Sequence, residues 1–334
     1  MRPWMLGVAA LTLAPLMLAG GAAQAASGYR VIDRVAGPDG FWDYVRVDAK
    51  NNRVLLTHGT SVMAIDLATK AVSSFAPGGR LHIALPVNGG SEVLVTNGGT
   101  NTADFYDLKG AKVASVETGK GPDDAAIEPK TGLLMVIDHA GGQITLVDGK
   151  AHKAVGTIDV GGDLEEAATD GSGRAYVNVE NKGEIAVVDV PGRKVLAHWP
   201  LGGCEGPTGL AYDAADKLLL AACGGGATAV VDAKTGKVVQ TLSTGMGADG
   251  IAFDAKQKLA FVPAGRAGTL SVISISGGKA SVVDTVPTQV SARTIALDAR
   301  TGRLYLPAAR YAPAAGGGRP TITPGSFEVL VVGK

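Results

Sequence analysis

The sequence is poor in aromatic residues, carries little cysteine and has no excess of charge of either sign. Aromatic residues make up 5% of the 334 residues, there are 2 cysteines, and 31 basic residues balance 31 acidic ones. A balanced charge provides no general attraction to nucleic acid or to anionic lipid. Few aromatic side chains leave little surface on which single-stranded bases could stack. We therefore expect a partner other than nucleic acid.

Long apolar runs are also absent, with one exception at the N-terminus. The run "WMLGVAALTLAPLMLAG" follows Arg2 and precedes "AQA" at residues 23–25. A positive start, an apolar run and a small-residue cleavage site are typical of a signal peptide. No later segment approaches the roughly 20 apolar residues of a membrane span. We predict a signal peptide over residues 1–25 and an exported, periplasmic protein that begins at Ala26 or Ser27.

Glycine and a repeated phrase are what the chain has in abundance. There are 48 glycines, and "VVDAKTGKVV" in the second half has four earlier relatives, such as "LVDGKAHKAV". The aspartates of the five copies follow one another at intervals of about 42 residues: Asp66, Asp107, Asp148, Asp189 and Asp232. Such a fixed period indicates a repeat architecture.

Each repeat contains four short apolar runs. In the fifth these are "TGLAYD", "KLLLAAC", "TAVVD" and "KVVQTL", separated by Gly, Asp and Asn and without helical spacing. A four-stranded unit of about 40–45 residues is typical of a β-propeller blade. We predict an all-β fold: one seven-bladed β-propeller of four-stranded antiparallel blades over residues 26–334.

Two further sets of equivalent positions, which we call columns, recur in the repeats. One is acidic and closes the first strand of most units, with Pro86 in its place in the second unit. The other lies two residues earlier and holds alanine: Ala84, Ala126, Ala168, Ala211, Ala252 and Ala296. We expect these alanines where the inner strands converge on the axis. Arg46 occupies the column in the first unit. A buried arginine needs a partner, and Asp43 is the candidate; a less tightly packed first blade is the alternative.

The last blade is short of one strand. It ends in "SFEVLVVGK", which provides a third strand only, and "YRVIDRV" follows the leader. We expect residues 29–37 to supply the fourth strand, which would close the ring and remove two sheet edges. Residues 311–325 are predicted to be an insertion in this blade.

The two cysteines fall in the fifth repeat. Cys204 precedes its first strand and Cys223 ends its second. Folding the chain about a turn at 214–215 places residue 206 opposite Cys223, so the two thiols would lie close together. After export a disulfide is the expected state, and a copper–thiolate site is the alternative.

The chain resembles the YVTN-repeat, or YncE-like, seven-bladed propellers of bacterial periplasms. The resemblance rests on the "D-x-x-T/x-G/x-K-V" hairpin, on the blade entries "GPDDAAIEP" and "GCEGPTGLAYD", and on the leader peptide. It implies a periplasmic binding or accessory protein. No catalytic motif defines that family, so none is carried over to this chain.

Ligands of propellers usually bind at the face where one blade leads into the next, and there the loops gather polar residues. The predicted ligand-binding funnel consists of Trp42, Asp43, His82, Asp123, Asp124, Glu165, Glu166, Asp249, Arg266, Arg293 and Arg310. Ordinary rim charges that keep a neutral protein soluble are the alternative for the carboxylates. Ordinary blade packing is the alternative for Trp42.

Three of the five histidines, His58, His82 and His139, fall on this face in consecutive blades. Imidazoles with carboxylates are suited to zinc, copper or another divalent transition metal ion. A metal-binding set of these three histidines is therefore one hypothesis, and three unrelated rim residues is the other.

The sequence has no nucleophile elbow and no phosphate-binding loop before a helix. The first functional hypothesis is a monomeric binding or accessory protein whose funnel takes a small solute, a metal ion or a periplasmic protein. The alternative is a metal-dependent propeller hydrolase or lyase. Binding of single-stranded DNA is a second alternative, which the balanced charge disfavours.

Overall fold

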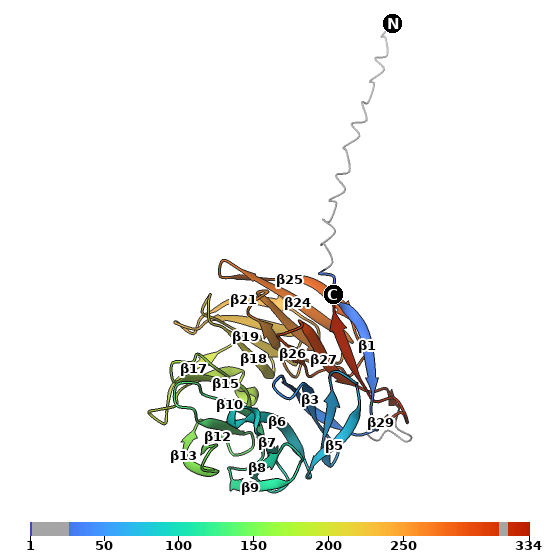
Figure 1. Ribbon diagram of the computed structural model, residues 1–334. Coiled ribbons are helices and arrows are strands. Elements are labelled where there is room, and N and C mark those ends of the chain that lie inside the picture. The colour runs from blue at the N-terminus through green and yellow to red at the C-terminus, as the bar shows by residue number, and fades with distance from the viewer. Residues whose placement is uncertain (2–26, 314–319) are drawn as a thin grey trace.

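The computed structural model describes Met1, residues 27–313 and residues 320–334. The predicted signal peptide therefore lies, apart from Met1, outside the described residues. The described strands form seven four-stranded antiparallel sheets, arranged as blades around a ring (Figure 1). This confirms the predicted all-β, seven-bladed propeller.

Blades 1 to 6 are each built from four consecutive strands. Blades 1 to 3 consist of β2 (Trp42–Asp48), β3 (Arg53–His58), β4 (Ser61–Asp66) and β5 (Val72–Pro77); β6 (Leu81–Val87), β7 (Glu92–Asn97), β8 (Thr102–Asp107) and β9 (Lys112–Glu117); and β10 (Pro122–Ile127), β11 (Leu134–Asp138), β12 (Gln143–Asp148) and β13 (Lys153–Asp159). Blades 4 to 6 consist of β14 (Leu164–Thr169), β15 (Arg174–Val179), β16 (Glu184–Asp189) and β17 (Lys194–Pro200); β18 (Pro207–Asp213), β19 (Leu218–Cys223), β20 (Ala227–Asp232) and β21 (Val238–Ser243); and β22 (Ala252–Asp254), β23 (Leu259–Ala264), β24 (Thr269–Ser276) and β25 (Lys279–Pro287). The first strand of each blade lies nearest the axis.

Blade 7 joins the two ends of the chain. It consists of β26 (Ala296–Asp298), β27 (Arg303–Ala308), β30 (Glu328–Gly333) and β1 (Arg30–Ala36). The antiparallel pairing of β1 with β30 runs from Arg30 opposite Gly333 to Ala36 opposite Glu328. The predicted closing strand is thus confirmed, and it ends at Ala36.

The predicted insertion in blade 7 lies between β27 and β30. It forms a two-stranded hairpin of β28 (Tyr311–Ala312) and β29 (Thr321–Ile322). Residues 314–319, between these two strands, lie outside the described residues.

The repeated aspartate shapes the hairpin between the third and fourth strands of a blade. In blade 5, Asp232 Oδ1 accepts backbone hydrogen bonds from Lys234 (2.8 Å) and Thr235 (3.0 Å). Asp66 does the same in blade 1 with Ala68 and Thr69. These backbone donors favour the charged carboxylate and lower the pKa of both aspartates. The repeated phrase is therefore explained by turn geometry.

Apolar side chains fill the space between neighbouring blades. Ile144 and Leu146 of blade 3, for example, form one cluster with Val177 and Val179 of blade 4, and all four are fully buried. Each sheet thus buries its faces against the next sheet, which explains why its strands are apolar almost throughout. No helix in residues 27–313 and 320–334 has the length and hydropathy needed to cross a bilayer.

The alanine column is shifted by one residue in blade 2. Arg46 is opposite Leu55 in blade 1, and the equivalent residue of blade 2 is Leu85, opposite Leu94. The prediction that Ala84 belongs to this column was therefore wrong. The step from the first blade to the second is shorter than the other steps, so an average spacing misplaces the register there.

Candidate functional site

The inner strand of each blade begins with the same backbone contact. The N–H that follows the second strand donates to a carbonyl in the entry loop, as Gly59 does to Phe41 (2.7 Å) and Gly98 to Arg80 (2.9 Å). In blade 7 the Ser291 hydroxyl accepts this bond. In every blade, the residue two positions after the acceptor occupies an equivalent place. In blade order these residues are Asp43, His82, Asp123, Glu165, Thr208, Asp249 and Arg293. We call these seven residues the entry ring.

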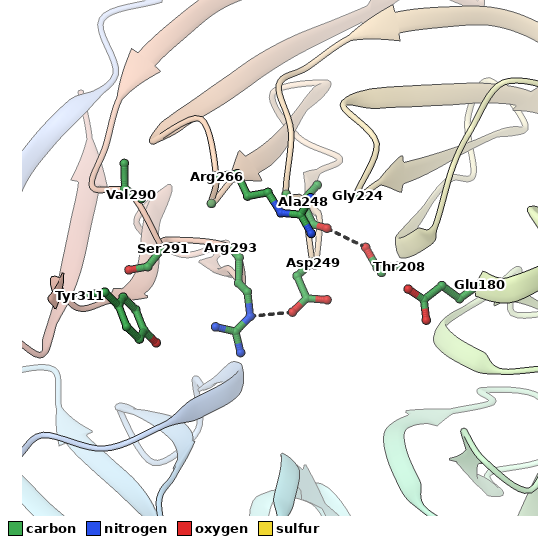
Figure 2. A pocket seen from close by; sticks show the side chains of 12 residues that line it. Glu180, Thr208, Gly224, Ala248, Asp249, Arg266, Val290, Ser291, Arg293 and Tyr311 are labelled. Carbon is green, nitrogen blue, oxygen red and sulfur yellow. Dashed lines mark hydrogen bonds and ion pairs between the residues drawn. The ribbon is translucent and has the colours of Figure 1, made fainter. Parts of the chain in front are cut away.

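Two adjoining hollows lie at the entry ring. A hollow of about 430 Å³ is bordered on the side of blades 5 to 7 by Thr208, Arg266 and Tyr311 (Figure 2). A second hollow, of about 300 Å³, lies on the side of blades 1 to 4. Both are lined by Asp249 and Arg293, whose side chains point toward each other, with Nε 2.8 Å from Oδ2. The ring residues therefore surround one polar depression.

Glycines form part of the lining of the larger hollow. Backbone hydrogen bonds join these glycines within blades 5 and 6 and between them: Gly224 donates to Gly206, Gly265 to Gly247, and Gly247 of blade 6 to Gly224 of blade 5 (2.8–2.9 Å). Gly247 has a φ of +83°, and a Cβ there would lie 2.6 Å from Arg266 Cγ. The hollow exists because no side chains project from these positions, and the hydrogen bonds hold the backbone in place.

His82 lies between two carboxylates from the neighbouring blades. Its Nδ1 is 2.7 Å from Oδ2 of Asp43 and 2.8 Å from Oδ1 of Asp123. Burial lowers the pKa of His82, but the hydrogen bonds to Asp123 and Asp43 outweigh it and raise the pKa to about 10. Burial raises the pKa of Asp43. The two carboxylates thus stabilise the protonated form of the His82 imidazole.

His139 forms a second group with Glu165 and Glu180. Its Nδ1 is 3.0 Å from the Leu164 carbonyl oxygen and 3.1 Å from Oε1 of Glu165. The hydrogen bond to Glu165 raises the pKa of His139 to about 9, and burial raises the pKa of Glu165 to about 8. One ligand atom from each of His139, Glu165 and Glu180 lies within 4.8 Å of the others.

A deeper layer crosses the axis below the ring. The Arg46 guanidinium of blade 1 lies 3.3 Å from Asp124 of blade 3 and 3.1 Å from Glu166 of blade 4. The expectation that Asp43 is its partner was wrong. The carboxylates also accept backbone hydrogen bonds from the following blades, from Ala167 and Leu210 (3.0 Å each).

This deeper layer is poorly hydrated. Burial raises the pKa of Asp124 to about 6 and that of Glu166 to about 7, even though Arg46 acts in the opposite direction. The Tyr44 ring lies under Arg46, with its centroid 5.2 Å from the guanidinium carbon, and its hydroxyl is 3.5 Å from Glu165. Asp124 and Glu166 thus belong to the structural closure of the axis.

Three residues predicted for the site lie elsewhere. Trp42 is only 4% exposed and packs on Phe327, with ring centroids 5.4 Å apart. His58 is buried beside the same phenylalanine (4.4 Å) and belongs to neither histidine–carboxylate group. Arg310 is exposed and lines a separate hollow together with Glu328. The structure thus favours blade packing for Trp42, and it does not bring the three predicted histidines together.

Apart from Asp124 and Glu166, which lie in the deeper layer, the other predicted funnel residues surround the depression: Asp43, His82, Asp123, Glu165, Asp249, Arg266 and Arg293. Sequence reasoning left Arg80 and Tyr311 out of the funnel, although both line its hollows. Arg80 stands two residues before His82, and its place in the entry loop was the available signal. Tyr311 reaches the site only because the insertion of blade 7 folds toward it.

The predicted disulfide between Cys204 and Cys223 is present, with the Cα atoms 5.6 Å apart. Pro207, one residue later than expected, lies opposite Cys223. The bond ties the loop before β18 to the end of β19, next to Gly224 of the larger hollow. It therefore fixes the backbone at one wall of the site.

No family model and no curated protein matches this chain. Its fold is similar to a chain of the mitotic checkpoint complex, at 14% identity and a TM-score of 0.72, covering 99% of this chain and 98% of that one. The WD40 repeats of RRP9 match at 10% identity and a TM-score of 0.75, with 92% and 98% covered. Hydrazine synthase of Kuenenia stuttgartiensis matches at 14% and 0.68, with 86% and 96% covered.

At such identities the likeness shows the fold alone. This chain is a seven-bladed β-propeller, and its structural neighbours include WD40-repeat proteins.

Proposed function

We propose that this chain is an exported binding propeller of the YVTN-repeat type that holds a small, positively charged ligand in the entry ring. One observation carries the proposal. Of the seven ring residues, four are carboxylates, and they face one shared depression: Asp43, Asp123, Glu165 and Asp249.

The electrostatics of the ring favour a cation. Burial is the largest cause of the raised pKa values of Asp43, Glu165 and Asp249, and the charge of Asp123 adds to it, because like charges at close range oppose ionisation. The one arginine of the ring, Arg293, is already held by Asp249 and by the carbonyl of Trp42 (2.7 Å). A bound cation would relieve the repulsion among the carboxylates that remain. The same carboxylates would repel a phosphodiester chain, which argues against single-stranded DNA as the ligand.

The disulfide and the leader support export. Disulfides persist in oxidising compartments and are rare in the cytosol. The N-terminal sequence has the three parts of a signal peptide, and Ser27 anchors the start of the propeller through its hydrogen bonds to Asp284. A cleavage just before Ser27 would thus leave the propeller complete.

Thermal unfolding of residues 27–334 tests the binding proposal. We expect spermidine and divalent metal ions to raise the melting temperature, and citrate to have no effect. A double variant, Asp123→Asn with Glu165→Gln, removes two of the four ring carboxylates and should lose most of the response. Asp159→Asn, at an exposed position on β13, is the matched control and should respond like the wild type. Stabilisation by citrate, or an equal response of the double variant, would contradict the proposal.

Export is tested separately, by expressing the full chain in a bacterial host and sequencing the N-terminus of the periplasmic product. We expect Ala26 or Ser27 as the first residue. A full-length chain retained in the cytoplasm would refute export without affecting the binding proposal.

A further inference from the structure

Three ligand atoms of the entry ring converge on one point. Nδ1 of His82, Oδ2 of Asp43 and Oδ1 of Asp123 come from three successive blades, and they lie within 4.8 Å of one another. One imidazole nitrogen and two carboxylate oxygens form a common donor set for divalent transition metals, which bind them at about 2.0–2.2 Å.

We infer that Asp43, His82 and Asp123 bind a divalent transition metal ion such as Zn²⁺. The inference rests on the proposed function, since it names the cation that the ring takes. Metal ions of this class favour a nitrogen donor, and His82 places one beside the carboxylates of Asp43 and Asp123.

The carboxylates of Asp43 and Asp123 have unused acceptor positions. In the described part of the chain, the side chains of Asp43 and Asp123 receive no hydrogen bond other than from His82. The structural carboxylates just below differ, because Asp124 and Glu166 each accept a backbone N–H. The single Nδ1 hydrogen of His82 cannot serve two carboxylates fully. A metal ion bonded to all three atoms would satisfy each of them.

The backbone carbonyl of each of the three proposed ligands accepts a hydrogen bond from a buried threonine of the preceding blade. The Thr294 hydroxyl donates to the carbonyl of Asp43 (3.0 Å). Thr57 donates in the same way to His82 (2.8 Å). Thr96 donates to the carbonyl of Asp123 (2.7 Å).

All three threonines are at most 1% exposed: Thr57, Thr96 and Thr294. Contacts of this kind hold the ligand backbones at fixed positions, as a preorganised metal site requires.

The second histidine group fits a metal less well. Nδ1 of His139 faces the Leu164 carbonyl, which can only accept, so this nitrogen carries a hydrogen and only Nε2 is free to bind a metal. The carboxylate of Glu165 already accepts hydrogen bonds from Tyr44 and His139. Glu180, its third member, lies half-buried in the short helix η2 (Glu180–Lys182), and its carboxylate accepts no hydrogen bond from the described residues. This group therefore serves as the internal control.

The hollow beside the first group leaves room for further metal ligands. This hollow, of about 300 Å³, borders all three proposed ligands and opens to the surface beside the exposed Arg80. Water molecules or an anionic group on a ligand could complete the coordination sphere there, as at metal sites that keep an open position.

The test is metal titration of untagged protein spanning residues 27–334, first stripped with a chelator. Calorimetry with zinc chloride and absorption spectroscopy with cobalt chloride report stoichiometry and coordination. We expect one ion per chain, and a cobalt spectrum with a nitrogen ligand. His82→Gln and Asp123→Asn should each weaken binding about tenfold or more. His139→Gln, the matched control, should bind as the wild type does.

Circular dichroism verifies that every variant is folded. If His82→Gln does not fold, Asp43→Asn takes its place. Binding that is lost in His139→Gln and kept in His82→Gln would overturn the inference. So would a wild-type protein that takes up neither metal. If spermidine still stabilises that protein, the proposed function stands and only the metal inference fails; if it does not, both fail.

Discussion

The Arg46 guanidinium of blade 1 reaches Glu166 of blade 4 on the far side of the ring, with Nη2 3.1 Å from Oε1. The same nitrogen contacts Asp124 of blade 3. One long side chain from one blade thereby joins three blades at the axis. Alanine occupies the equivalent position in blades 3 to 7, and this leaves the space that Arg46 fills.

Replacing Arg46 by alanine should strongly destabilise the protein. Asp124 and Glu166 would remain buried without their cation, and breaking a buried ion pair typically costs about 3–5 kcal/mol. The free energy of unfolding from urea denaturation measures the effect. Arg34→Ala is the control, since Arg34 is half-exposed in its pair with Glu328 and should cost less than about 1 kcal/mol. Equal losses in the two variants would contradict the role assigned to Arg46.

Stability should fall as the pH rises from about 4.5 to about 7. The pKa of Glu166 is raised in the folded state to about 7 from its ordinary value of 4.5, because burial disfavours the carboxylate. The folded protein therefore binds the proton more tightly than the unfolded chain, so this contribution is complete below pH 4.5 and is lost as the pH passes 7. Asp124 acts in the same direction, with a pKa of about 6.

The variant Glu166→Gln tests this assignment. Glutamine keeps an oxygen for the Leu210 N–H but carries no charge, so the free energy of unfolding should vary less between pH 5 and pH 8. Glu117→Gln, at an exposed position on β9, should keep the slope of the wild type. A slope in Glu166→Gln as steep as that of the wild type would assign the pH dependence to other groups.

The disulfide should contribute roughly 3 kcal/mol of stability, since it closes a loop of 19 residues. The double variant Cys204→Ser with Cys223→Ser should lose that amount in urea denaturation. In the folded, unreduced wild type, a thiol reagent should label neither cysteine, and it should label both after reduction in denaturant. Labelling of both thiols without reduction would disprove the bond.

Removing the closing strand should open the ring. A chain that begins at Gly37 lacks β1 and leaves β30 as an exposed edge, which invites pairing with another chain. We expect a lower melting temperature and a larger apparent mass in size-exclusion chromatography. A chain that begins at Ser27 is the control and should remain monomeric. If the shorter chain elutes and melts like this control, the closure is dispensable.

The sequence by itself determined the architecture, because the signals for it are local. Short apolar strands and aspartate turns such as that of Asp232 repeat with one period, and each repeat depends only on residues nearby. The disulfide and the closing strand followed from counting positions within single blades. The columns also placed His82, Asp123 and the other ring residues on one face, since equivalent positions of a repeat must lie at equivalent places in the ring.

Only the tertiary structure decided which of those residues meet. Arg46 and Glu166 are 120 positions apart, and their contact depends on the width of the ring and the direction of each side chain. The sequence predicts that His58 and His82 both lie at the entry face. In the structure, His58 packs against Phe327, whereas His82 faces two carboxylates. Side-chain direction at the end of a strand and the convergence of seven blades on one axis are properties of the folded ring, which no single repeat contains.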